Sequence, residues 1–408
     1  MYKRGIAVMG AACAVALAVS ACGDSGGSSA DASGGPSTLK IGLLTSLSGP
    51  SSSAFVATES GVTARFAAYK EDGGKCASTT FDVVKADDQS TAQGALTATQ
   101  KLIQQDKAYA VIEMSPFFFG AAQFATTAGK DTPIIGGGFD GAEQWKVTTN
   151  NLLPSGLVPD ATTTFATNGQ YLKMAGGTKV AGIAYAGSPS SKAANESAVK
   201  SAEAAGLTRG YINNSVPFGS TDVGAIVLGI IKSKSDVINM AINPDTAFAI
   251  VGGLKQAGYA TKAVLSATGY GADLLDSAPA VQAGQGMTFS TAWAPNELNT
   301  PATQRMAKAM KEHAGSKSGI PGFAQVMGWM AADLLVHGLE LAGCDATQAK
   351  FLSTVRADKT WDGGGLWPEK RDFSTVKITK QCFYFLRLKG AAFVPEADAM
   401  PLCATPVG

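Results

Sequence analysis

The sequence predicts an α/β protein whose globular part forms two doubly wound lobes, each built on a parallel β-sheet. Apolar runs typical of strands alternate with segments of helical periodicity along most of the chain. The alternation restarts after Pro159, and the chain beyond residue 38 is long enough for two lobes of ordinary domain size. In sheets of this kind, ligands bind where loops leave the carboxyl ends of the strands.

The first residues have the layout of a secretory signal peptide. Lys3 and Arg4 precede an uncharged run of about fifteen small and apolar residues. This run is shorter than the roughly twenty residues that a membrane-spanning helix needs. Residues 19–22 read Val-Ser-Ala-Cys and fit the bacterial lipobox. We therefore predict a signal peptide at 1–21 and lipidation of Cys22; an ordinary signal peptide with an incidental cysteine is the alternative.

A segment rich in Gly, Ser, Ala, Asp and Pro follows the predicted cleavage site. Such a composition buries too little apolar surface to offset the entropy of ordering, so residues 22–38 are expected to act as a lipidated, flexible tether. The globular part would then start near Leu39. The protein is expected outside the cytoplasm, anchored to the outer face of the cell membrane.

The charge balance argues against a nucleic-acid partner. The chain has 33 basic and 32 acidic residues, and loss of Lys3 and Arg4 with the leader leaves 31 against 32. No clustered basic run supplies the positive face that binding to nucleic acid requires. Hydrophobic residues at 45% with charged residues at 16% instead indicate a well-packed body.

Four cysteines remain after the leader and Cys22 are set aside, an even number for an oxidising compartment. Cys382 and Cys403 flank a candidate strand pair, so we pair them, which leaves Cys76 with Cys344. Four cysteines allow three pairings, and free thiols are the alternative. The spacings match no zinc site, and no metal or cofactor is predicted.

The elements expected before Pro159 follow strand-helix order. Strands are expected at 39–44, 80–85, 109–114 and 132–135. Helices are expected at 59–69, 91–104 and 120–128.

The elements expected after Pro159 repeat this order and then change it. Strands are expected at 180–184, 208–212, 237–241, 263–267 and 286–292, and helices at 161–174, 191–205, 222–232, 246–256, 302–313 and 324–341. Near the C-terminus, strands at 382–388 and 391–394 flank Lys389-Gly390, a two-residue hairpin turn.

The order and spacing of several short motifs carry a family resemblance. They are residues 40–44, Ser48-Gly49-Pro50, Gly61, residues 87–90, 111–112, 132–135, 254–258 and 361–366. In these motifs the chain resembles the solute-binding proteins of ABC importers, specifically the branched-chain amino acid (Leu/Ile/Val-binding) type. The resemblance covers nearly the whole mature chain. Proteins of this type have the periplasmic-binding-protein type I fold.

The resemblance implies two lobes joined by a hinge of three segments that close on a ligand. It implies lobe 1 from 39–156 plus 290–377 and lobe 2 from 157–289 plus 378–408, with crossovers near Gly156, Phe289 and Lys377. It also implies a monomer that binds a small molecule and delivers it to permease subunits in the membrane.

The positions that hold a zwitterion in amino acid-binding members depart from the family pattern. Hydroxyl groups and backbone N–H groups of lobe 1 hold the carboxylate there, and an acidic residue of lobe 2 holds the ammonium. Here the corresponding segments read Ser-Pro-Phe-Phe-Phe at 115–119 and Gly-Gly-Phe-Asp at 137–140, with Thr268 at the acidic position. An unpaired buried charge is costly, so we expect a ligand that is not a standard branched-chain amino acid.

We therefore expect an aromatic, weakly polar cleft. The candidate wall residues are Phe55, Phe117, Phe139, Tyr185, Tyr270 and Trp293, with Pro116 and Gly138 in the same loops. The candidate hydrogen-bonding residues are Ser115, Asp140, Ser190, Asn243, Asp245 and Thr268. Some of these aromatic residues are alternatively core, above all their neighbours Phe118 and Phe119.

Enzyme motifs are weak. Residues 136–141 satisfy G-x-G-x-x-G but lie at the fourth strand, and Ser197 to Lys200 satisfies S-x-x-K without the S-D-N or K-T-G that accompany it in enzymes. The two histidines, His313 and His337, lack partners at metal or triad spacing.

We expect no enzyme but a binding protein that delivers an aromatic or apolar solute to an ABC importer. A ligand-sensing lipoprotein of the same fold, acting with a receptor or kinase, is the alternative.

Overall fold

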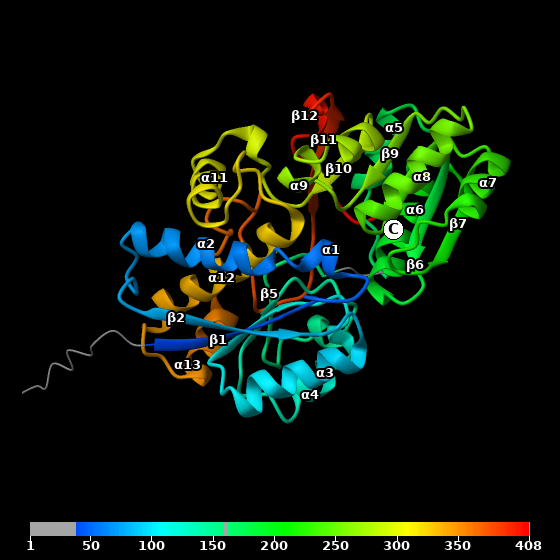
Figure 1. The fold of residues 1–408 in the computed structure, drawn as a ribbon. Coiled ribbons are helices and arrows are strands. Elements are labelled where there is room, and N and C mark those ends of the chain that lie inside the picture. The colour runs from blue at the N-terminus through cyan, green and yellow to red at the C-terminus, as the bar shows by residue number, and fades with distance from the viewer. Residues whose placement is uncertain (1–37, 159–161, 408) are drawn as a thin grey trace, which may run out of the picture. The chain divides into compact units, whose positions relative to one another are not determined.

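The computed structural model describes residues 38–158 and 162–407 (Figure 1). The predicted leader, its cleavage site and Cys22 lie outside these residues. The described chain forms two α/β lobes, and we call the lobe with the smaller sheet lobe 1 and the other lobe 2. The predicted fold class is confirmed.

Lobe 1 is built on a five-stranded, all-parallel sheet of order β2-β1-β3-β4-β5. Its strands are β1 Thr38–Thr45, β2 Thr80–Asp87, β3 Ala110–Met114, β4 Ile134–Gly136 and β5 Leu152–Pro154. Its helices are α1 Ser52–Phe55, α2 Thr58–Glu71, α3 Ala92–Gln100, α4 Ala122–Thr126, α11 Pro301–His313, α12 Phe323–Ala342 and α13 Gln348–Ala357.

The inner strands β1, β3 and β4 are buried on both faces, which explains their nearly continuous apolar runs, whereas the edge strand β2 alternates with exposed polar residues. Ile41 and Leu43 face a core with α2 and α12, whereas Leu44 faces a second core with α3 and α4. Figure 1 shows α2 and α12 on one side of β1 and α3 and α4 on the other. Gly61 lets the two long helices touch, because a Cβ there would lie 2.0 Å from the carbonyl oxygen of Gln325.

Lobe 2 is built on a larger sheet of order β12-β11-β10-β9-β8-β6-β7, with β13 paired to β11. Its strands are β6 Lys179–Tyr185, β7 Thr208–Val216, β8 Val237–Ala241, β9 Ala263–Ser266, β10 Thr288–Thr291, β11 Gln381–Lys389, β12 Ala392–Pro395 and β13 Leu402–Ala404. The sheet is parallel from β7 to β10 and antiparallel from β10 onward.

Helices also cover both faces of the larger sheet. They are α5 Thr167–Met174, α6 Pro189–Ala204, α7 Gly224–Ser233, α8 Pro244–Gln256, α9 Ala272–Leu275 and α10 Ala278–Gly284. Helices α5 and α6 form a hydrophobic core with one face of the sheet, and α7 and α8 form another with the opposite face. Short helical turns of other types are η1 Lys101–Gln105, η2 Phe118–Gly120, η3 Glu143–Lys146, η4 Asn296–Leu298 and η5 Ala397–Ala399.

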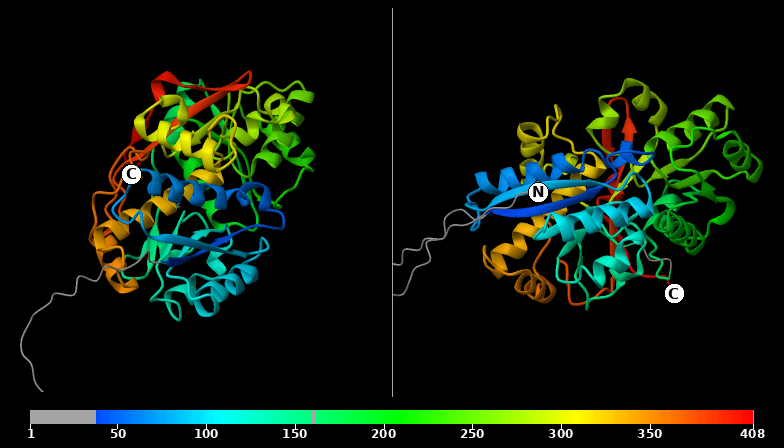
Figure 2. Two further views of the ribbon diagram at one scale, coloured as in Figure 1. Left: turned by 60° about the vertical axis from the view of Figure 1, so that its left-hand side comes forward. Right: turned by 60° about the horizontal axis from the view of Figure 1, so that its bottom comes forward.

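The chain passes between the lobes three times, after β5, after β10 and before β11. In Figure 2 the third passage is the orange-to-red segment that returns to the larger sheet. The second boundary differs from the expected one near Phe289, because β10 keeps Ser290 and Thr291 paired with Phe385 and Tyr384 in the larger sheet. Lobe 1 therefore resumes after Thr291.

Several element boundaries differ from the sequence prediction. The helix expected at 161–174 begins only at Thr167, because Phe165 bridges to Pro406 and the preceding threonines are poor helix formers. The hairpin turn lies one residue later, at 390–391, since Lys389 pairs with Ala392 and Gly390 has a φ of 59°. Strand β5 and helix α13 were not predicted, being too short or too weakly periodic.

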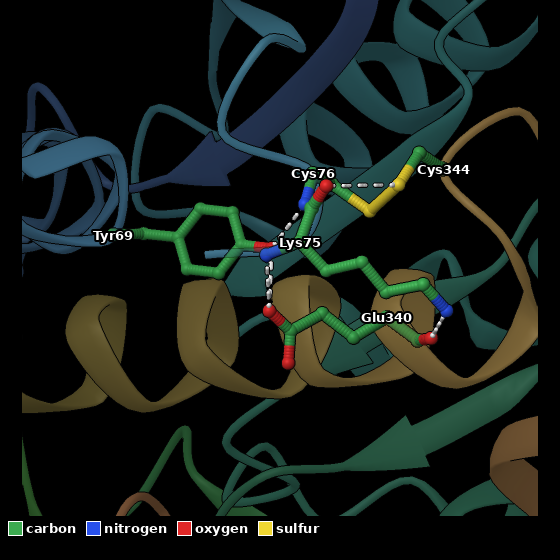
Figure 3. The surroundings of a disulfide bond; sticks show 5 residues. All are labelled: Tyr69, Lys75, Cys76, Glu340 and Cys344. Carbon is green, nitrogen blue, oxygen red and sulfur yellow. Dashed lines mark hydrogen bonds between the residues drawn. A yellow bond between two sulfur atoms is a disulfide. The ribbon is translucent and has the colours of Figure 1, made fainter. Parts of the chain in front are cut away.

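Two disulfides join the pairs expected from the sequence, Cys76 with Cys344 and Cys382 with Cys403. The first ties the chain after α2 to the chain after α12 (Figure 3). Beside it, the Tyr69 hydroxyl donates to Glu340 Oε1 at 2.7 Å and accepts the Cys76 N–H at 2.9 Å. The second disulfide links β11 to β13 directly across a strand pair.

A buried ion pair lies between α2 and α12. Arg65 Nε donates to Asp333 Oδ1 at 2.7 Å, and Trp361 Nε1 donates to the other carboxylate oxygen at 2.7 Å. Arg65 also lies over the rings of Tyr69 and Trp329. Of the helices in the described part of the chain, none combines the length and the apolar character that crossing a membrane demands.

Candidate functional site

A cavity of about 1000 Å³ lies between the two sheets. Its walls come from loops after β3 and β4 in lobe 1, from loops after β6, β8 and β9 in lobe 2, and from all three crossing segments. These are carboxyl ends of parallel strands, where α/β proteins bind ligands. The volume lies at the upper end of the range for small-molecule sites, roughly 300–1000 Å³.

The lobe 1 wall is an aromatic cluster of Phe55, Phe139, Trp293 and Phe323. The rings of Phe55 and Phe139 stack with centroids 5.5 Å apart, and Phe323 lies edge-on to both, at 6.1 and 5.8 Å. Trp293 lies 6.1 Å from Phe323. Three of the four were predicted. Phe323 was missed, although it directly precedes the helix expected at 324–341.

The lobe 2 wall combines aromatic rings with polar groups. Tyr185 stacks on Phe218 at 4.2 Å, and its hydroxyl accepts the backbone N–H of Asn243 at 2.9 Å. Ser190 and Thr268 also line the cavity, and Thr268 Oγ1 donates to the Ile242 carbonyl at 2.7 Å. Among the described wall residues of lobe 2 none is acidic, so no carboxylate takes the place of Thr268 as a partner for a ligand ammonium. The two acidic residues of the described wall, Glu369 and Asp372, belong to the third crossing segment.

The structure brings eight of the predicted ligand-binding residues to the cavity wall: Phe55, Pro116, Phe139, Tyr185, Ser190, Asn243, Thr268 and Trp293. It places the other six outside the wall: Ser115, Phe117, Gly138, Asp140, Asp245 and Tyr270. Each of the six follows a strand as expected, but five side chains are directed or engaged elsewhere and the sixth residue, Gly138, has none.

Internal contacts account for four of these placements, those of Ser115, Phe117, Asp140 and Tyr270. Ser115 Oγ donates to Asp88, and Phe117 packs between Phe119 and Phe218. Gly138 has no side chain, and its φ of 68° favours glycine; a Cβ there would lie 2.8 Å from Cγ2 of Val158. Asp245 is exposed in the first turn of α8, and the Tyr270 hydroxyl donates to Glu297 Oε2 at 2.7 Å. Phe118 is fully buried core, as the alternative interpretation held.

Asp140 belongs to a group of buried carboxyls behind the lobe 1 wall. It accepts hydrogen bonds from Trp145 Nε1 and Ala142 N, and burial raises the pKa of Asp140 to about 7. Glu113 Oε1 accepts the Ser115 N–H at 2.6 Å, while Glu113 Oε2 is buried with no partner among the described residues. Burial and then the charge of Asp140 raise the pKa of Glu113 well above its ordinary value. These carboxyls shape the loops after β3 and β4.

The sequence analysis expected a crossover near Lys377 but did not predict that this third crossing segment supplies much of the cavity wall. Residues 367–383 line it almost without interruption, and Arg356 of α13 joins them. Arg371 lies with its guanidinium 5.0 Å from the ring centroid of Trp367 and donates to the Gly156 carbonyl at 2.8 Å. The signal for this segment was its basic and aromatic composition beside an expected crossover.

The enzyme-like motifs do not assemble into a catalytic group within the described residues. Ser197 lines the cavity, but Lys200 pairs with Glu196 at 3.2 Å. His337 contacts Asp358 at 2.9 Å. Donor atoms of Glu71, Glu312 and His313 lie within 4.8 Å of one another, yet these exposed groups already pair among themselves and with Lys308.

Comparisons with known proteins agree with this architecture. The family described as periplasmic binding protein matches residues 38–392. A solute-binding protein of an R. palustris ABC transporter, solved in complex with benzoate, is 21% identical; the match covers 91% of this chain and 98% of that chain with a TM-score of 0.73. No curated protein sequence matches the chain.

Two further solved structures have the same fold. A branched-chain amino acid ABC transporter protein from Thermus thermophilus with bound valine is 18% identical, with 91% of this chain and 97% of that chain covered and a TM-score of 0.72. A fatty acid ABC transporter substrate-binding protein from Thermomonospora curvata is 19% identical, with 91% and 94% covered and a TM-score of 0.69. With the family match spanning most of the residues, the chain belongs to the periplasmic binding protein family.

Proposed function

We propose that this protein captures a small aromatic or apolar solute between its lobes, outside the cytoplasm, and delivers it to an ABC importer. The observation that carries the proposal is the aromatic cluster of Phe55, Phe139, Trp293 and Phe323 on the cavity wall. Such rings bury large apolar areas and orient flat or alkyl ligands.

The groups at two family ligand positions, Thr268 on the wall and Ser115 behind it, support a ligand other than a branched-chain amino acid. The Thr268 hydroxyl donates its hydrogen bond to the Ile242 carbonyl, and the Ser115 hydroxyl donates its hydrogen bond to Asp88. Neither position offers the charge or free hydroxyl that a zwitterion would need. Solved proteins of the same fold include ones in complex with benzoate and 4-hydroxybenzoate and one described as a fatty acid ABC transporter substrate-binding protein.

The anchor completes the proposal. Lipid on Cys22 would hold the two-lobed body at the membrane, and residues 23–37 would let it reach a permease. The same clamp would also serve a membrane receptor, so delivery needs its own test. Uptake of labelled ligand by vesicles containing the partner permease, with and without this protein, measures delivery; signalling without uptake would favour the sensor.

Ligand identity is tested most directly by mass spectrometry of small molecules released on denaturation of the purified protein. Calorimetry then compares benzoate and octanoate with leucine, isoleucine and valine. We expect binding of an aromatic or alkyl compound and none of the three amino acids at micromolar concentration. Micromolar or tighter binding of leucine, isoleucine or valine would refute the proposed ligand class.

A further inference from the structure

We propose that Arg371 binds the anionic group of the ligand, so that the solute is an organic acid whose apolar body contacts the aromatic cluster. This inference rests on the proposed function and narrows its substrate class. It assigns charge recognition to the third crossing segment of the hinge, away from the lobe 1 loops that hold the carboxylate in amino acid-binding relatives.

Arg371 is held in place but left with unused donors. Its backbone N–H donates to the Trp361 carbonyl at 2.7 Å, its guanidinium lies over Trp367, and one Nη2 hydrogen bonds to the Gly156 carbonyl. A guanidinium has five N–H donors. In the part of the chain that the structure describes, the remaining donors have no acceptor, while the residue lines the cavity.

No carboxylate neutralises this guanidinium within residues 38–158 and 162–407. The two acidic residues of the cavity wall are engaged elsewhere, Glu369 with Lys380 and Asp372 with Lys359. Burial lowers the pKa of Arg371 to about 10, so the side chain stays charged at neutral pH. A half-buried cation without a counter-ion is costly, and an anionic ligand would remove that cost.

The position of Arg371 joins it to the aromatic cluster. Its acceptor, Gly156, lies against Gly137, since a Cβ on Gly156 would come 2.4 Å from the Gly137 carbonyl oxygen, and Gly137 lines the cavity beside Phe139. On the other side, the Leu366 carbonyl accepts the Ala294 N–H at 2.8 Å, which places Trp367 near Trp293. One ligand can therefore contact both features.

The rest of the described wall has the same electrostatic character. Basic residues outnumber acidic ones by six to two: Lys146, Arg356, Lys370, Arg371, Lys377 and Lys380 against Glu369 and Asp372. Of the six, Lys146 pairs with Glu143 and Lys380 pairs with Glu369. A wall on which cations outnumber carboxylates favours an anionic ligand, which a carboxylate is.

The test compares matched acids and amides on the full chain, purified as the cell produces it. Calorimetry gives Kd for benzoate against benzamide and for octanoate against octanamide, in the wild type and in Arg371→Gln and Arg371→Lys. The control is Arg209→Gln, which makes the same change at an exposed arginine of β7 paired with Glu203. Circular dichroism and Tm confirm folding of each variant.

We expect the wild type to bind at least one acid at least tenfold more tightly than its amide. Arg371→Gln should raise the Kd for that acid by roughly 10- to 100-fold and change the Kd for the amide by less than about threefold. The Kd of Arg371→Lys for the acid should lie between those of the wild type and Arg371→Gln, because lysine keeps the charge but lacks the planar guanidinium that binds a carboxylate through two N–H groups. Arg209→Gln should match the wild type.

Two results overturn the role of Arg371 while leaving the proposed function standing. One is equal wild-type affinity for acid and amide. The other is an equal loss for both compounds in Arg371→Gln, which marks a merely structural contact with Gly156. Failure of all four compounds to bind the wild type instead rejects the proposed ligand class, and this inference with it.

Discussion

The rings of Phe55 and Phe139 stack at a centroid distance of 5.5 Å with 21° between their planes. One ring comes from α1, after the first strand, and the other from the loop after β4. Parallel strands place both loops at the same sheet edge, and Phe323 at the start of α12 covers the pair. The cluster therefore exists only once distant segments have folded together.

Phe139→Ala should weaken binding of the apolar ligand by roughly tenfold or more, since burying an aromatic ring contributes about 1.5–3 kcal/mol. Calorimetry with the ligand found by mass spectrometry measures the effect. Phe81→Ala is the matched control, because Phe81 stacks on Phe66 at 4.2 Å and does not line the cavity. An equal loss of ligand affinity in both variants would mean that Phe139 affects binding only by stabilising the fold.

Asp333→Ala should lower the free energy of unfolding by about 3–5 kcal/mol, because it leaves Arg65 buried and unpaired and deprives Trp361 of its acceptor. Glu203→Gln breaks the exposed pair with Arg209 and should cost about 1 kcal/mol or less. Urea unfolding of both variants gives the comparison. Similar costs would show that the buried pair is not isolated from water.

Removal of the Cys76–Cys344 disulfide should cost more stability than removal of Cys382–Cys403. Their sequence separations are 268 and 21, and the loop-entropy account then predicts a difference of about 2 kcal/mol. Paired serine variants, Cys76→Ser with Cys344→Ser and Cys382→Ser with Cys403→Ser, are compared by chemical unfolding. A larger loss for the second pair would contradict this account.

Glu113→Gln should stabilise the protein above neutral pH. Burial raises the pKa of Glu113 well above its ordinary value and the pKa of Asp140 to about 7. A raised folded-state pKa means that these groups support folding fully below about pH 4 and lose that support as pH rises through the folded pKa. The variant should thus gain on the order of 2–4 °C in Tm at pH 8 and little at pH 4.

Thermal unfolding from pH 4 to pH 8.5 measures this dependence. Asp87 and Asp236 have lowered pKa values and act with the opposite sign, but only at more acidic pH. A variant whose Tm follows the wild-type curve in parallel would show that Glu113 does not titrate in this range.

Cys22→Ser should release the protein from the membrane fraction, because Cys22 is the predicted lipid acceptor. Cys13→Ser is the control and should leave the protein membrane-bound, since Cys13 lies inside the apolar run of the leader. Fractionation with immunoblotting measures both. Continued membrane attachment of the Cys22 variant would exclude lipidation at this residue as the anchor.

The sequence by itself determined the two-lobed α/β fold and the region of the cleft. Apolar periodicity is a local property, so strands such as Thr38–Thr45 and helices such as Thr58–Glu71 could be placed within a few residues. Strand order then sets which loops meet, and eight predicted residues reached the cavity wall.

Only the tertiary structure decided which side chains face the cavity. Ser115 and Asp140 follow the expected strands, yet Asp88 and Trp145 hold them inside lobe 1. Phe323 and Arg371 come from segments far along the chain, and no local pattern places them on the same cavity wall as Phe139. Side-chain direction depends on contacts between distant residues, and those contacts exist only after the chain has packed.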